Sequence, residues 1–123
     1  MDMKIELIPI PVTDVDRAKA FYVDQVGFHA DHDGTPYEGL RFVQLTPSGS
    51  ARSIVLGQGV TEMAPGSVNG YLMVVTDAAK AREELLGRGV DVSELDPREW
   101  GTFAHFKDPD GIAWSLQQLP KRG

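Results

Sequence analysis

Histidine is the side chain best suited to moving protons near neutral pH, and this sequence has three, His29, His32 and His105. His105 lies in the run Phe103–Lys107, whose composition and alternation predict a β-strand. Because side chains alternate along a strand, we expect His105 to share a face with Phe103. There it could act as a general acid or base, or hydrogen-bond to a ligand. The alternative is a partly exposed strand histidine bonded to a neighbour or to water.

Other polar and aromatic residues could bind a ligand beside this histidine. Ser115 and Gln117 have the same parity in the predicted strand Ile112–Leu119, so we expect both on one face. Such a neutral polar lining suits an uncharged or zwitterionic organic molecule. Trp100 could stack on a planar ligand, or it could cover a sheet edge. Arg41 could hold a carboxylate or phosphate with two hydrogen bonds, or it could point into solvent.

A metal site or a nucleophile elsewhere in the chain is less well supported. His29 and His32 would align on a helix, but the run Phe28–Asp33 predicts a strand, on which they face opposite sides. On that pattern Asp31 and Asp33 share the face of His29, and we interpret the segment as a solvated strand end. The sequence also lacks cysteine, a G-x-S-x-G motif and a P-loop.

Composition narrows the class of protein. The 123 residues carry a net charge of −6, which opposes general binding to nucleic acid. The longest apolar run, Tyr71–Val75, is far too short to cross a membrane. Met1–Glu6 has neither the basic nor the apolar part of a secretion signal. We therefore expect a cytoplasmic protein that forms a single domain over residues 1–123, with no membrane or nucleic-acid partner.

The chain contains an internal repeat. Val12–Asp14 (VTD) recurs 63 residues later as Val75–Asp77, and the turn Thr46–Gly49 (TPSG) is matched 62 residues later by Asp108–Gly111 (DPDG). An ordered series at a nearly constant offset indicates two copies of one module. The first copy spans about residues 4–60, the linker about 61–69 and the second copy about 70–120.

Each copy is predicted to fold as a strand, a helix and three further strands. In the first copy we expect strands around residues 7–12, 28–33, 40–45 and 53–56, with a helix that begins at Thr13 or Asp14. In the second copy we expect strands at 71–75, 90–95, 103–107 and 112–119, with a helix that begins at Thr76 or Asp77.

Three segments carry a resemblance to a known family: VTDVDRAKAFYVDQVGF (12–28), VTDAAKAREELLGRGV (75–90) and FKDPDGIAWSLQQ (106–118). They resemble the glyoxalase/bleomycin resistance/extradiol dioxygenase superfamily, also called the vicinal oxygen chelate superfamily. The resemblance covers nearly the whole chain. It implies an α+β fold in which two βαβββ modules form a curled mixed sheet around a cup-shaped cavity. It also implies a homodimer.

The same resemblance identifies the positions at which members of the superfamily bind a metal. Those ligands come from the first and last strands of each module, and here the positions fall on Leu7, Ser53 (or Val55, depending on register), Gly70 and Ser115. None of these residues is a histidine or a carboxylate, which zinc, manganese and iron prefer. We therefore expect a small, metal-independent member that needs no cofactor.

These observations predict a protein that binds a small molecule, either a metabolite or an antibiotic, in the cup. One alternative is a metal-independent isomerase, cyclase or lyase that uses His105 as its general acid or base. A second is a divalent-metal, glyoxalase-type enzyme with relocated ligands. The residues expected to line the ligand site are Leu7, Arg41, Ser53, Gly70, Trp100, Phe103, His105, Ser115 and Gln117.

Overall fold

A computed structural model describes residues 1–120, so the last three residues of the expected domain, 121–123, lie outside the described residues. The elements follow the order β1 (Leu7–Pro9), α1 (Val15–Ala20), the π-helix η1 (Phe21–Val26), β2 (His29–Tyr37), β3 (Leu40–Thr46), β4 (Ser53–Gln58), β5 (Tyr71–Val74), α2 (Ala78–Gly87), β6 (Asp96–Arg98), β7 (Gly101–Lys107) and β8 (Ala113–Gln118).

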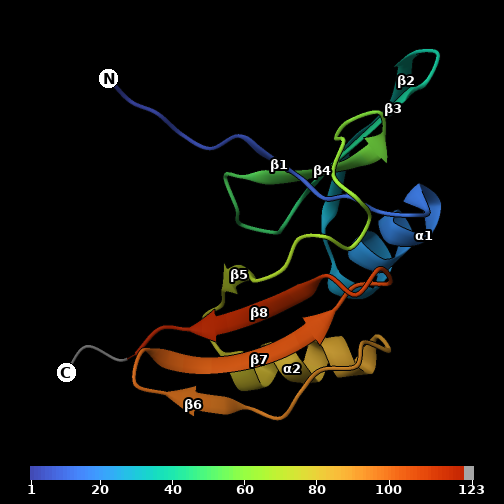
Figure 1. Cartoon of the computed structure of the whole chain (residues 1–123). Helices are drawn as coiled ribbons and strands as arrows, with labels where there is room; N and C mark the ends of the chain where they lie inside the picture. Colours follow the sequence, from blue (N-terminus) through green and yellow to red (C-terminus); the bar gives the residue numbers. More distant parts are fainter. Residues whose placement is uncertain (121–123) are drawn as a thin grey trace.

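The strands form two four-stranded mixed sheets of the same topology (Figure 1). The first sheet has the order β1-β4-β3-β2 and the second the order β5-β8-β7-β6. In each sheet the first strand pairs in parallel with the last, and the other pairs are antiparallel. The predicted α+β fold of two βαβββ modules is therefore confirmed.

Both modules begin their first helix in the same way. The side chain of Asp14 accepts a hydrogen bond from the backbone N–H of Arg17, and Asp77 accepts one from that of Lys80. Each aspartate satisfies an N–H group that the first helical turn leaves unpaired. The repeated VTD motif thus marks the two helix starts.

A buried aromatic cluster joins the two modules. The ring of Trp114 in β8 packs against Tyr22 and Phe28 of the first module, with ring centroids 5.9 and 6.1 Å away. The indole Nε1 donates to the hydroxyl of Tyr22, which donates in turn to Asp108 at 2.7 Å. Burial raises the pKa of both Tyr22 and Asp108. The helical segment of the first module is therefore bonded to the DPDG turn of the second.

The expected strand at residues 90–95 is wrong, because the structure places β6 at Asp96–Arg98 instead. Val90 and Val92 are buried, so their alternation reflects packing rather than ladder pairing. Ser93 contacts β7 through its N–H, which donates to the carbonyl of His105, and its hydroxyl, which accepts from the N–H of His105. A serine side chain thus replaces part of the expected backbone pairing.

The expectation that Asp31 and Asp33 share a face is also wrong. The pairing of β2 with β3 shifts between Ala30 and His32, which is a β-bulge. The extra residue reverses the alternation. The carboxylate of Asp31 therefore accepts from Thr46, whereas that of Asp33 accepts from Lys19 on α1.

Candidate functional site

The open face of the second sheet gathers most of the residues that the sequence suggested. Strand register places Leu72, His105 and Ser115 in one row across β5, β7 and β8. The next row on the same face contains Phe103 and Gln117. The residues of opposite parity in β7 and β8 lie in the hydrophobic core: Ala104, Phe106, Trp114 and Leu116.

A line of three hydrogen-bonded side chains crosses this face. The Nδ1 atom of His105 lies 2.8 Å from the hydroxyl oxygen of Ser115. Its Nε2 atom lies 3.2 Å from Oδ2 of Asp96 in β6. Arg98 donates from Nε to the other carboxylate oxygen of Asp96, and the hydrogen bonds from Arg98 and from His105 lower the pKa of Asp96.

The line has the residue types of a serine hydrolase but not its surroundings. Such enzymes also need hydrogen-bond donors aimed at the oxyanion that forms beside the nucleophile. Ser115 lies within β8, whose backbone pairs with β5 on one edge and with β7 on the other. The arrangement therefore favours hydrogen bonding to a ligand or proton transfer over acyl transfer.

Aromatic and apolar groups surround the line. The ring of Phe103 is stacked on that of His105, with centroids 6.2 Å apart and planes 13° apart. Trp100, which is 60% exposed, precedes β7, and its carbonyl accepts from the side-chain amide of Gln117 at 2.9 Å. Leu72 presents an exposed apolar side chain from β5. Phe103 is buried, so the face offers the exposed side chains of His105, Trp100 and Leu72 beside a few oriented polar groups, which is typical of ligand sites.

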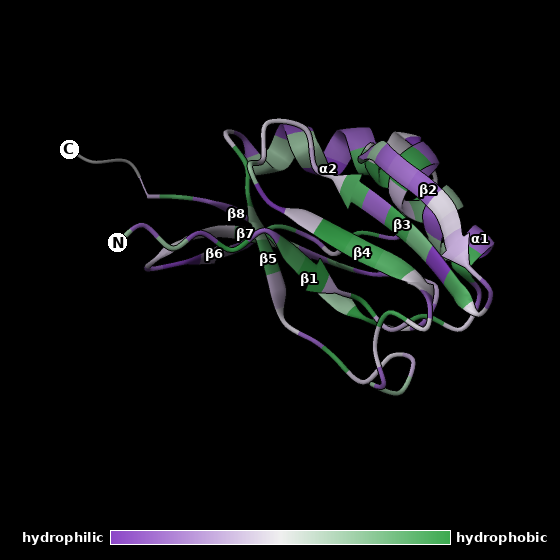
Figure 2. Cartoon of the chain, turned by 90° about the horizontal axis from the view of Figure 1, so that it is seen from above, coloured by the Kyte–Doolittle hydropathy of each residue, from purple (hydrophilic) through white to green (hydrophobic). Residues whose placement is uncertain are grey.

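The first sheet carries a similar line of side chains, in which the hydroxyl groups bond to one another. Ser53 lies opposite Leu7, and its hydroxyl is 2.6 Å from that of Thr46, which donates to Asp31. Gln44 also donates to Ser53. Ser53 is only 6% exposed, and the rest of β4, the strand that it begins, is largely hydrophobic (Figure 2). These hydroxyls are already bonded to one another.

Two expected ligand-binding residues lie apart from these lines. Arg41 has the parity of the core residue Val43, and its guanidinium pairs with Asp16 of α1 at 2.8 Å and with Asp33 at 3.1 Å. Those partners raise the pKa of Arg41, and its hydrogen bond lowers the pKa of Asp33 to about 2. Arg41 therefore lies on the helix side of its sheet. Gly70 contributes backbone alone, because its N–H donates to the carbonyl at 113.

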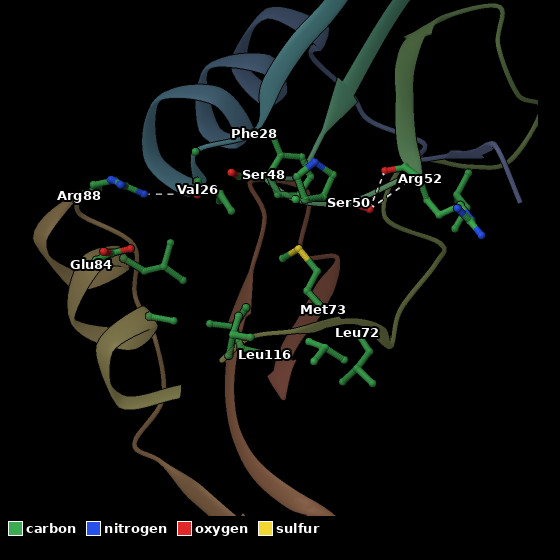
Figure 3. Close-up of a pocket in the computed structure, with 18 residues that line it drawn as sticks. Val26, Phe28, Ser48, Ser50, Arg52, Leu72, Met73, Glu84, Arg88 and Leu116 are labelled. Carbon is green, nitrogen blue, oxygen red and sulfur yellow. Dashed lines mark hydrogen bonds between the residues drawn. The ribbon is translucent and has the colours of Figure 1, made fainter. Parts of the chain in front are cut away.

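A cavity of about 610 Å³ lies between the two modules, and its lining was not predicted from the sequence (Figure 3). Phe28, Met73 and Leu116 form much of its apolar wall, and Arg88 donates to the backbone carbonyl of Val26 at one end. None of the expected ligand-binding residues lines it. Its walls come from segments far apart in the sequence, so no local motif marks them.

A family model described as "Glyoxalase/Bleomycin resistance protein/Dioxygenase superfamily" matches residues 4–116. The chain belongs to this superfamily. YetH of Bacillus subtilis (strain 168) is 30% identical to it over 96% of this chain and 100% of its own length. No helix among residues 1–120 is long and apolar enough to cross a membrane.

Two solved structures from Streptomyces sp. CB03234 resemble the chain closely. TnmS3, described as an antibiotic binding protein, is 36% identical with a TM-score of 0.87, and the match covers 97% of this chain and 98% of TnmS3. A glyoxalase/bleomycin resistance protein is 37% identical with a TM-score of 0.81, over 94% of this chain and 100% of that one.

The donor set at the superfamily's metal positions does not fit a metal. Leu7 and Gly70 have no side-chain atom that could ligate a metal, and Ser53 and Ser115 offer hydroxyls that are already hydrogen-bonded. Divalent transition metals prefer imidazole, carboxylate or thiolate ligands. Across residues 1–120, no three histidine, aspartate or glutamate side chains gather closely enough to hold an ion.

Proposed function

We propose that this protein binds a small organic molecule, a metabolite or an antibiotic, on the open face of the second sheet and without a metal ion. The Asp96–His105–Ser115 line, with Phe103 stacked beside it, is the observation that carries the proposal. It gives fixed polar groups within an aromatic and apolar surface. The likeness to TnmS3, an antibiotic binding protein, supports the same class of ligand.

A ligand of this kind would lay a planar part against the exposed rings of His105 and Trp100. Its polar groups would hydrogen-bond to Ser115 and Gln117, which lie two residues apart on the same face. Aromatic side chains offer a large contact area at a low cost in conformational entropy. No step in such binding needs a Lewis acid.

A second copy of the chain would cover the apolar part of this face. Leu72 and Val74, which are two residues apart in β5, are at least half exposed. Clustered exposed apolar side chains are typical of protein interfaces. We therefore propose a homodimer, which sedimentation equilibrium at micromolar concentration tests. A monomeric mass would contradict it.

The ligand site can be located by nuclear magnetic resonance with 2-naphthol as a planar probe. In protein treated with EDTA, addition of 2-naphthol should shift the amide signals of Phe103, His105, Ser115 and Gln117 most strongly. The same titration with zinc or manganese added should give an unchanged affinity. Shifts confined to the cavity residues Phe28 and Met73, or binding that requires a metal, would contradict the proposal.

The hydrogen bond between Asp96 and His105 favours one further candidate, a metal-independent isomerase, cyclase or lyase. A carboxylate that orients an imidazole and stabilises its charged form is a common arrangement in general-base catalysis. The ketone 2-tetralone exchanges the protons next to its carbonyl for deuterium, and this exchange reports on such a base. If His105 is catalytic, His105→Ala should slow the exchange about 100-fold. Equal rates in both proteins would exclude this function for that class of ketone.

A further inference from the structure

We infer that Asp96 and His105 fix the hydroxyl of Ser115 as a hydrogen-bond acceptor, so that the site selects ligands that bring a donor, such as a phenolic hydroxyl. The inference rests on the proposed binding function and adds the chemistry of the group that is bound. The direction of the hydrogen bonds from Arg98 to Asp96, between Asp96 and His105, and between His105 and Ser115 determines the role of the Ser115 hydroxyl.

The assignment begins at Asp96. An ionised carboxylate can only accept hydrogen bonds. Arg98 donates to one of its oxygens and the ring of His105 meets the other at 3.2 Å. The Nε2 atom of His105 must therefore carry the proton that this bond uses.

The orientation of Ser115 follows from that tautomer. A neutral imidazole has a proton on only one nitrogen, so Nδ1 of His105 is left as an acceptor. Ser115 lies 2.8 Å from that atom and must donate its hydroxyl proton to it. Its oxygen then offers only lone pairs to a ligand. In the same row, the opposing residue in β5 is Leu72, whose side chain cannot hydrogen-bond.

The surroundings indicate which kind of donor fits. Phe103 and His105 form a stacked pair beside Ser115, and Trp100 is exposed nearby in the chain. Phe103 itself is buried, so the ring that is open to a ligand beside Ser115 is that of His105. A flat ring that carries a hydroxyl can lie against the imidazole while its O–H points to Ser115. The ligand class is therefore an aromatic or enolic hydroxyl compound rather than its ether or ketone.

The line in the first sheet, whose hydroxyl groups bond to one another, shows why this property belongs to the second module alone. Thr46 donates to Asp31, so Ser53 donates to Thr46, and Gln44 donates to Ser53. Ser53 is buried and already accepts one hydrogen bond. Ser115 is half-buried and no described side chain donates to it.

The tautomer can be measured directly. Nitrogen-15 chemical shifts of the imidazole at pH 8, where histidine side chains are ordinarily neutral, should show His105 protonated on Nε2. In Asp96→Ala the shifts should move toward a mixture of the two tautomers, while the exposed control Asp91→Ala should leave them unchanged. A proton on Nδ1 in the wild-type protein would overturn the inference.

Ligand selection is tested with 2-naphthol and 2-methoxynaphthalene, which have similar shapes and differ in the donor. Wild-type protein at pH 8 should bind 2-naphthol about five- to tenfold more tightly, the effect of one hydrogen bond. Ser115→Ala should abolish this preference, Asp96→Ala should reduce it, and Asp91→Ala should retain it. Circular dichroism of each variant verifies that it is folded.

The outcomes separate the inference from the function on which it rests. Equal affinity of the wild-type protein for the two compounds would overturn the inference and leave small-molecule binding intact. A preference that survives in Ser115→Ala would also overturn it, because another residue would then accept the hydrogen bond. Failure of both compounds to bind would contradict the proposed function and the inference together.

Discussion

Each module has a hydrogen-bonded line of three side chains that runs from an aspartate to a serine. The two lines differ in the residue between them. Each has a serine in its last strand and an aspartate in or beside its second, Ser53 with Asp31 and Ser115 with Asp96. The third strand supplies Thr46 in the first module and His105 in the second. Ser53 in the hydroxyl line is buried, whereas His105 is 44% exposed. The middle residue is thus a hydroxyl side chain in the first module and an exposed imidazole in the second.

The turns that precede the last strands also differ, and here the second module has the more buried polar group. In the turn Thr46–Gly49, Ser48 and Gly49 are exposed and the other two residues are half-buried. In Asp108–Gly111, the carboxylate of Asp108 is buried and accepts from the hydroxyl of Tyr22 and from the backbone N–H groups of residues 110 and 112. The first module therefore has its tightest polar network at the serine, and the second has it at the turn.

The largest effect is expected from breaking the buried turn. Asp108→Ala should lower the free energy of unfolding by about 3 kcal/mol, because it leaves the O–H of Tyr22 and two backbone N–H groups without an acceptor. The exposed Ser48→Ala in the matching turn should change it by less than about 0.5 kcal/mol. Urea denaturation measures both. Equal losses would show that the two turns are equivalent.

The same substitution at the two serines should have different consequences. Ser53→Ala removes two side-chain hydrogen bonds in a buried position and should cost about 1 kcal/mol of stability. Ser115→Ala should change stability by less than about 0.5 kcal/mol while weakening the binding of 2-naphthol. Urea denaturation and calorimetric titration of both variants test this. A Ser115→Ala protein destabilised as much as Ser53→Ala would mean that both lines are structural.

The repeat and the fold were readable from the sequence because their signals are local. The aspartates of the two VTD motifs cap helices directly, and alternation in 103–107 and 112–119 predicted which side chains share a face. Asp96 was missed because β6 is a three-residue strand that contains Pro97 and shows no alternation. Its contact with His105 depends on the pairing of β6 with β7, which no local pattern specifies.

Replacing His105 by the threonine of the first module tests whether this residue accounts for the difference between the two lines. His105→Thr reproduces the residue of the first module and removes the acceptor for the Ser115 proton. The preference for 2-naphthol over 2-methoxynaphthalene should fall from about five- to tenfold to below about twofold. Parallel calorimetric titrations measure it, with Asp91→Ala as the control. An unchanged preference would show that the imidazole does not orient Ser115.

The smallest effect on stability is expected at Asp33, which pairs with Arg41 and Lys19 on the helix side of the first sheet. The hydrogen bond from Arg41, and then that from Lys19, lowers the pKa of Asp33 from 3.8 to about 2. Because the folded protein holds this proton less tightly than the unfolded chain, the stabilisation is complete above about pH 5 and is lost as the pH falls toward 2. Solvent screening limits it to less than about 1 kcal/mol. The stability difference between wild type and Asp33→Asn in urea should therefore shrink as the pH falls from 5 to 2, and a constant difference would show that Asp33 titrates as it does in the unfolded chain.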